Sequence, residues 1–196
     1  MRSREVYRAC QRVMTVRLYL SIATVLGLAG CGAPQTSVAT SEPVNALAID
    51  LSVTGDGTAA LAAHCTARNV SAAPVQVFDW PRMPYLLDER GTLVVLHGIS
   101  PPPEDRDLNA IEIPMTRTLA PGESLTFEAP LVPLKLHSHY GDEPAGTAHH
   151  GVAAIVCRVA HGATPIDAAA RAHTTIATLR TWQQIESSPT LVVRLP

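Results

Sequence analysis

The sequence predicts an all-β domain: a sandwich of antiparallel sheets with about eight short strands and one short helical or irregular segment near residues 165–186. Along most of the chain after residue 44, apolar residues alternate with polar ones at a period of two, as in strands that bury one face. Turn residues interrupt this alternation about every 8–12 residues, which is typical of sandwiches. No internal repeat with a period of about 20–50 residues is visible.

The first half of the domain contains five alternating stretches. They are residues 47–53, 59–67, 75–80, 85–87 and 92–97. Thr-Gly-Asp-Gly at 54–57 and Asp-Glu-Arg-Gly at 88–91 supply the turn residues of two hairpins. Pro81 ends the third stretch, because proline cannot continue a strand ladder.

Four further strands are expected in the second half. They are residues 111–118, 125–131, 152–160 and 190–195. Pro114 interrupts the first of them, which suits an edge strand. Residues 99–109, with three consecutive prolines, and residues 132–150, rich in His and Gly, are predicted to be loops. Residues 165–186 are ambiguous, since they combine an alanine run that favours helix with a β-branched run that favours strand.

Two stretches are similar to segments of immunoglobulin-like domains that are common in bacterial envelope proteins. RNVSAAPVQV at 68–77 resembles a strand and its loop, and LAPGESLTF at 119–127 resembles a turn and its strand. Cys65 and Trp80 stand fifteen residues apart, near the spacing of true immunoglobulin domains. Ile155, however, takes the place where such domains carry a tyrosine. The resemblance therefore implies a generic immunoglobulin-like sandwich and no particular function.

The N-terminal residues have the layout of a secretory signal peptide. An apolar, uncharged run at 18–29 follows Arg12 and Arg17 and leads into Leu-Ala-Gly-Cys, which ends at Cys31. This ending resembles the lipobox of bacterial lipoproteins, in which the cysteine is acylated and becomes the first residue of the mature chain. The resemblance implies a signal peptide over residues 1–30 and a lipid on Cys31. The alternative, a membrane-spanning anchor, needs about 20 apolar residues.

Residues 31–43 are predicted to be a flexible tether, and residues 44–196 the β-sandwich domain. The tether consists of small polar residues and prolines without periodicity, and such a chain reaches about 20 Å. Gly32 follows the cysteine where an Asp could signal retention in the inner membrane. The resemblance therefore favours the outer membrane of the cell envelope, with the domain facing the periplasm.

The charge of the mature chain argues against a nucleic-acid partner. Residues 1–30 hold five Arg and one Glu, and their removal leaves 10 basic and 16 acidic residues, a net charge of about −6. Such a chain lacks the basic footprint of a nucleic-acid binder and a polybasic surface for anionic lipid. Its hold on the membrane must come from the acyl chains on Cys31.

Two cysteines remain after processing, because Cys10 leaves with the signal peptide and Cys31 carries lipid. Cys65 and Cys157 both lie on the apolar face of their strands, and an oxidising envelope compartment favours a disulfide between them. Two buried free thiols are the alternative. A disulfide requires the two Cα atoms to come within about 7 Å.

Histidines cluster in one segment, as His137, His139, His149 and His150. If residues 137–139 are extended, both of their imidazoles point to one side. A loop could then bring His149 or His150 across to complete three nitrogen ligands for Zn or Cu(II). The alternative is a solvated polar loop, because the spacing matches no closed metal motif.

Trp80 and Tyr85 stand around two prolines. An exposed pair of aromatic rings could hold a peptide or a sugar, but aromatic residues at strand ends more often fill the core. Trp182 is expected to cover one end of the sandwich. The other histidines are scattered and are expected to be surface or core residues.

No enzyme is expected, since the chain contains no G-x-S-x-G, H-E-x-x-H, C-x-x-C, P-loop or G-x-G-x-x-G motif. The predicted function is that of a non-catalytic binding or structural module, tethered to the membrane and partnered by another envelope protein. One alternative is a periplasmic metal-binding protein that uses residues 137–150. Another is a protease inhibitor that presents the proline-rich loop 100–107.

Overall fold

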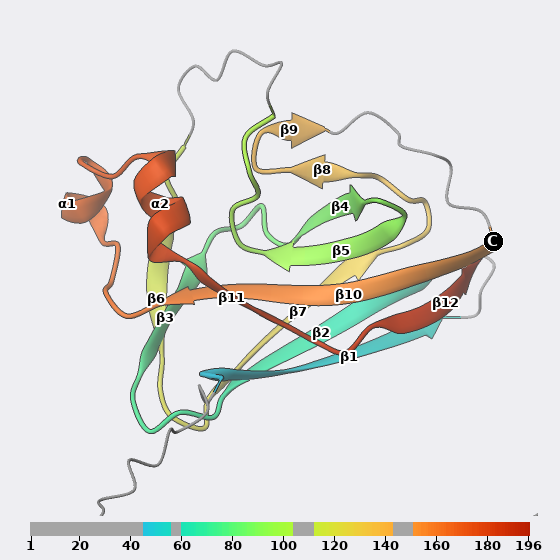
Figure 1. Ribbon diagram of the computed structural model, residues 1–196, viewed down its shortest axis with the longest axis horizontal. Coiled ribbons are helices and arrows are strands. Elements are labelled where there is room, and N and C mark those ends of the chain that lie inside the picture. Colours follow the sequence, from blue (N-terminus) through green and yellow to red (C-terminus); the bar gives the residue numbers. More distant parts are fainter. Residues whose placement is uncertain (1–44, 56–59, 104–111, 143–150) are drawn as a thin grey trace, which may run out of the picture. The chain divides into compact units, whose positions relative to one another are not determined.

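The computed structural model describes residues 45–55, 60–103, 112–142 and 151–196, which fold into two β-sheets with two short helices (Figure 1). All of them belong to one compact unit, residues 41–196. Several predictions fall outside the described residues. They are the signal peptide, the tether, and the roles of Cys31, His149 and His150.

The smaller sheet has three antiparallel strands in the order β1-β2-β7. They are β1 (Leu47–Gly55), β2 (Leu61–Asn69) and β7 (Ser124–Pro130). The predicted alternation sets their two faces. In β2, for example, Ala63, Cys65 and Ala67 are buried, whereas His64 and Thr66 between them are partly exposed. One face of the sheet is therefore apolar and the other is polar.

The larger sheet is built around one long strand, β10 (Gly151–Gly162), which pairs with four others (Figure 1). The path through this sheet is β6-β3-β10-β5-β4-β8-β9, and β11 and β12 also pair with β10. The other strands are β3 (Val75–Asp79), β4 (Tyr85–Glu89), β5 (Thr92–His97), β6 (Met115–Leu119), β8 (His137–Ser138), β9 (Gly141–Asp142), β11 (Gln184–Ser187) and β12 (Leu191–Leu195).

The expectation of purely antiparallel sheets is wrong, because β5 and β10 run parallel and make the larger sheet mixed. Parallel neighbours cannot be joined by a tight turn and need a long connection. Here β6 to β9 lie between β5 and β10 in sequence. The connection is therefore long enough to bring β10 beside β5 in either the parallel or the antiparallel direction. The alternation within each strand carries no information about that choice.

The described residues also contain more strands than the eight expected. The segment 132–150, predicted to be a loop, contributes β8 and β9, which are too short to show a period. The ambiguous segment 165–186 contains α1 (Ala168–Arg171), α2 (Ile176–Trp182) and the start of β11. Both helices begin at a capping side chain: that of Asp167 accepts two backbone N–H bonds, and that of Thr175 accepts one.

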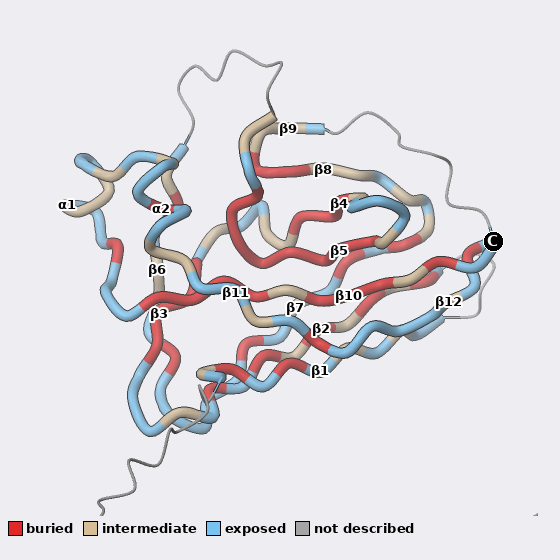
Figure 2. Tube along the Cα trace, in the orientation of Figure 1, coloured by how far each residue is buried: buried red, intermediate tan, exposed pale blue. Residues whose placement is uncertain are grey.

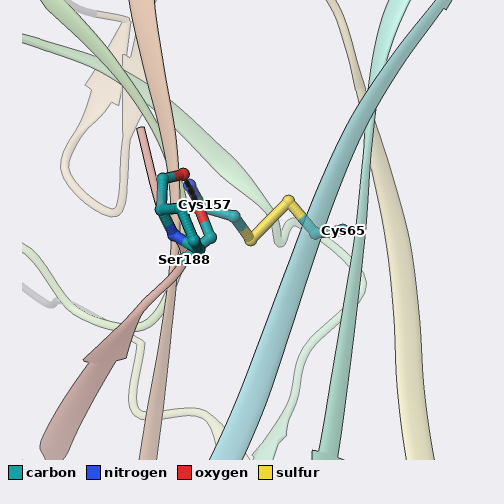
Figure 3. The surroundings of a disulfide bond; sticks show 4 residues. Cys65, Cys157 and Ser188 are labelled. Atoms are coloured by element: carbon teal, nitrogen blue, oxygen red, sulfur yellow. Dashed lines mark hydrogen bonds between the residues drawn. A yellow bond between two sulfur atoms is a disulfide. The ribbon is translucent and has the colours of Figure 1, made fainter. Parts of the chain in front are cut away.

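The predicted disulfide is confirmed. Cys65 in β2 is bonded to Cys157 in β10, and their Cα atoms lie 6.2 Å apart (Figure 3). The bond joins the middle strand of the smaller sheet to the central strand of the larger one, inside an apolar cluster that both sheets share. Figure 2 shows buried residues concentrated along β10, β5 and β3.

Ser188 forms hydrogen bonds with the backbone of Cys157, beside the disulfide. Between β11 and β12, its backbone N–H donates to the carbonyl of Cys157 at 2.9 Å, and its hydroxyl accepts from the N–H of Cys157 at 3.0 Å (Figure 3). Pro189 follows and has no N–H to offer. Both backbone groups of Cys157 are therefore satisfied where the ladder between β11 and β12 is interrupted.

Trp182 packs at the helical end of the larger sheet, as expected. Its ring lies 5.1 Å from that of Phe78, and its indole N–H donates to the carbonyl of Thr164 at 2.8 Å. A Cβ on Gly162 would overlap the indole, so the close approach requires glycine at this position.

Candidate functional site

A groove of about 500 Å³ lies where β7 of the smaller sheet faces β4 and β8 of the larger one. Its lining residues are Pro84, Leu86, Glu128, Ala129, Pro130, Pro133, Lys135, His137 and Asp142. Three prolines and two aliphatic side chains make the surface largely apolar, and four polar or charged side chains stand on it. This combination is the usual chemistry of a binding groove.

The connection from β7 to β8 builds one wall of the groove. After β7 ends, the inward positions change from odd to even numbers: Val132, Leu134 and Leu136 are partly buried against the shared core, while Pro133 and Lys135 between them line the groove. Pro133 and Lys135 are therefore exposed on the groove side, because the side chains of their neighbours point inward. The sequence carried this signal, but the prolines and histidines of the segment made it look like an irregular loop.

β7 lies at one edge of the smaller sheet. Its only strand partner among the described residues is β2. The N–H of Leu131 donates to Leu61, and the carbonyl of Glu123 accepts from Asn69, so the odd-numbered residues of this segment face β2. In an antiparallel ladder the intervening residues turn their N–H and C=O groups away. Thr126 and Glu128 therefore present backbone groups to the side where the groove lies.

The opposite edge of the smaller sheet lies against other elements. The N–H of Ala46, just before β1, donates to the carboxylate of Glu186 in β11 at 3.3 Å. Ala46, Leu51 and Val53 of this edge also pack against the shared core. The two edges thus differ, and the β7 edge is the one that borders a groove.

The structure places His137 and His139 in different surroundings. His137 lines the groove, and its ring nitrogens lie 3.2 Å from the carbonyl oxygens of Lys135 and Pro84. His139 is 7% exposed, and its Nδ1 lies 2.9 Å from the hydroxyl of Tyr85. Both imidazoles contact the ring of Tyr85, so they do lie on one side of the segment.

A buried polar cluster surrounds His139. Tyr140 donates from its hydroxyl to the carbonyl of Ser100 at 3.0 Å, and its ring lies 5.5 Å from that of His139. Burial lowers the pKa of His139, and the nearby Arg82 guanidinium lowers it further. Burial also raises the pKa of Tyr85 to about 12. The phenol of Tyr85 is therefore uncharged at neutral pH.

The described residues bring only part of the predicted metal site together. His137 and Asp142 are direct partners in the β8–β9 pairing and both line the groove. Within the described ranges, no group of three or more His, Cys, Asp or Glu side chains is close enough to hold a metal ion. His149 and His150 lie outside those ranges, so the metal site stays a prediction.

A row of polar side chains crosses the outer face of the smaller sheet. Thr54 Oγ1 lies 2.6 Å from His64 Nε2, and His64 Nδ1 lies 3.5 Å from a carboxylate oxygen of Glu128. The order of groups is that of a nucleophile, a base and an acid. The His64 and Glu128 side chains are 39% and 70% exposed, so water surrounds them and screens their charges. We assign this row to cross-strand stabilisation.

The loop considered for protease inhibition is only partly described. Ser100 is buried. The backbone N–H of the preceding Ile99 donates to the side-chain oxygen of Gln183 at 3.1 Å, and the side-chain nitrogen of Gln183 donates to the carbonyl of Ile99 at 2.7 Å. Residues 104–107 lie outside the described residues. The part of the loop that the structure shows is anchored to the helical end of the domain.

A comparison with models of protein families, with curated proteins and with solved structures finds no match to this chain. In the part of the chain that the structure describes, no helix is long and apolar enough to cross a membrane.

Proposed function

We propose that this chain is a lipid-anchored lipoprotein of the bacterial cell envelope, and that its domain is a non-catalytic module that binds another envelope protein. The observation that carries the proposal is the Cys65–Cys157 disulfide at the centre of the fold. Disulfides persist in oxidising compartments and are rare in the cytosol. The lipobox-like ending at Cys31 supplies the anchor, and residues 32–43 supply the tether.

We also infer that the domain is a divergent immunoglobulin-like sandwich. Two sheets share one core, and a disulfide connects them, as in many domains of that class. The parallel pairing of β5 with β10, and Ile155 in place of a tyrosine, are the departures from the pattern. The resemblance supports a binding role only in general terms, because this fold serves many functions.

Membrane fractionation tests the anchor. The wild-type chain is expected to sediment with the envelope membranes, and mass spectrometry is expected to find acyl chains on Cys31. Cys31→Ser is expected to release or mislocalise the chain, because the acyl chains are lost and no polybasic surface replaces them. The matched control Cys10→Ser should leave the fractionation unchanged. Equal membrane retention of Cys31→Ser and wild type would contradict the lipoprotein assignment.

A second candidate function is metal binding in the groove. The pairing of His137 with Asp142 places an imidazole and a carboxylate on the same wall, which are the kinds of group that bind Zn or Cu(II). Calorimetric titration of the full chain with Zn and with Cu(II) tests it, with His173→Ala as a control outside the groove. Affinity weaker than about micromolar, or affinity unchanged in His137→Ala combined with His149→Ala and His150→Ala, would remove this candidate.

A further inference from the structure

Backbone hydrogen-bonding groups lie along β7, at the border of the groove. Pro84, Pro130 and Pro133 have no N–H groups, so three positions of its lining cannot donate from the backbone. The N–H and C=O groups of Thr126 and Glu128, in contrast, point to the open side of β7. An extended chain laid along β7 would pair with these groups, as in other cases of strand addition.

The charges on the groove favour a cationic occupant. The lining residues include two exposed carboxylates, Asp142 on β9 and Glu128 on β7, whose carboxylate lies 3.5 Å from His64, and one ammonium group, that of Lys135. The mature chain as a whole carries a net charge of about −6 by residue count. A basic segment would therefore be attracted to this side of the domain, and an acidic one repelled.

The pairing geometry decides which residues of the occupant meet which surface. Glu128 projects its side chain from the outer, polar face of the sheet, while Ala129 beside it is buried on the inner face. A residue paired with Glu128 would share that outer face, where Lys or Arg suits it. Its neighbours in sequence would point the other way, toward Ala129 and Leu86, where small apolar side chains suit.

From this geometry we propose that the β7 edge and its groove bind an extended segment of a partner protein in which basic residues alternate with small apolar ones. The segment adds as a fourth strand to the sheet β1-β2-β7, with a basic side chain beside Glu128. This inference deepens the proposed function, since it names the chemistry of the partner. It does not depend on the lipid anchor.

Nuclear magnetic resonance titration tests the proposal. The probe is an acetylated and amidated hexapeptide of alternating Lys and Val, added to the ¹⁵N-labelled full chain with its disulfide intact and a chelator present. The amide signals of Thr126 and Glu128 are expected to shift on binding. A Glu and Val hexapeptide of the same length is expected to bind at least about tenfold more weakly, because its charges face carboxylates.

Three variants locate the site. Glu128→Lys is expected to weaken binding of the Lys and Val peptide by about tenfold, whereas Asp50→Lys makes the same charge change on β1 and is expected to leave it unchanged. Thr126→Pro removes the outward N–H without altering a bond to β2, and is expected to abolish binding. Circular dichroism confirms folding for each variant, and N-methylation of alternate peptide residues replaces Thr126→Pro if that variant does not fold.

Several outcomes would overturn the proposal. They are equal binding of the two peptides, shifts confined to surfaces away from β7, equal losses in Glu128→Lys and Asp50→Lys, and full binding of the N-methylated peptide. Sedimentation of the wild type as a dimer that Glu128→Lys or Thr126→Pro dissociates would also overturn it, because the edge would then pair with a second copy. None of these outcomes bears on the fractionation of Cys31→Ser, so the two proposals fail separately.

Discussion

The centre of the domain and its groove side are held by different kinds of contact. At the centre, β10 pairs along its length with four strands, and the disulfide ties it to β2. On the groove side, β8 meets β4 at a single paired position, Leu86 with His137. The rest of that attachment consists of side chains. The difference separates a centre held by long strand pairings and a disulfide from a border held by one paired position and by side-chain contacts.

The first prediction concerns the centre and has the largest expected effect. Cys65→Ala combined with Cys157→Ala removes a cross-link between positions 92 residues apart. The chain-entropy model gives a loss of about 4–5 kcal/mol as an upper figure, much of the ~5–15 kcal/mol of a typical domain. Urea unfolding is expected to show this loss, and the reductant-treated wild type should unfold at the same midpoint as the double variant. Equal free energies of unfolding for the oxidised wild type and the double variant would mean that the disulfide does not stabilise the centre of the domain.

The second prediction concerns acid. His97 is buried and its ring lies 5.1 Å from that of Phe127 on the other sheet, and burial lowers its pKa from 6.5 to about 4. Between those values the unfolded chain binds a proton that the folded chain does not. The contribution of His97 to the free energy of unfolding should therefore reach its full value above about pH 7. It should fall as the pH drops toward 4, by on the order of 3 kcal/mol.

Urea unfolding at pH 7 and pH 5 measures this slope. His97→Leu should reduce the difference between the two pH values, even though the substitution lowers stability at pH 7. Burial lowers the pKa of His139 as well, so a smaller slope of the same sign should remain. A slope unchanged in His97→Leu would assign the acid sensitivity to other groups.

The third prediction concerns the groove side and has the smallest effect. Tyr85→Phe removes the hydroxyl that lies 2.9 Å from His139 Nδ1, and a single buried hydrogen bond contributes about 1 kcal/mol. The loss should appear as local opening of residues 137–142 rather than as a large change in global stability. Thermal unfolding combined with hydrogen exchange separates the two effects. A global loss as large as that of the cysteine variant would show that the groove side belongs to the centre.

Sequence patterns predicted the local elements well where strands are long. The period of two located β1, β2, β7 and β10, and the inward positions of Cys65 and Cys157 predicted their pairing. The same patterns could not give the parallel partner of β10, since side-chain alternation is identical in parallel and antiparallel strands. Tertiary pairing decides that choice.

The candidate site was harder to predict, because its parts are distant in sequence. His137 lines the groove, but its role as a metal ligand stays a prediction, and Pro84 and Glu128 join it only through the packing of two sheets. The contact of Tyr85 with His139 spans 54 residues and leaves no periodic trace. The local signal is the alternation of Val132, Leu134 and Leu136, which are partly buried and lie one residue out of phase with the inward positions of β7.

Hydrogen–deuterium exchange on the oxidised full chain compares the two regions most directly. At neutral pH, peptides from β10 should exchange only through global unfolding, since both edges of that strand are paired. Peptides covering 137–142 and the outward amides of β7 should exchange through local opening or direct solvent contact, at least about 100-fold faster. Equal protection of β10, β7 and residues 137–142 would contradict the division into a rigid centre and an open border.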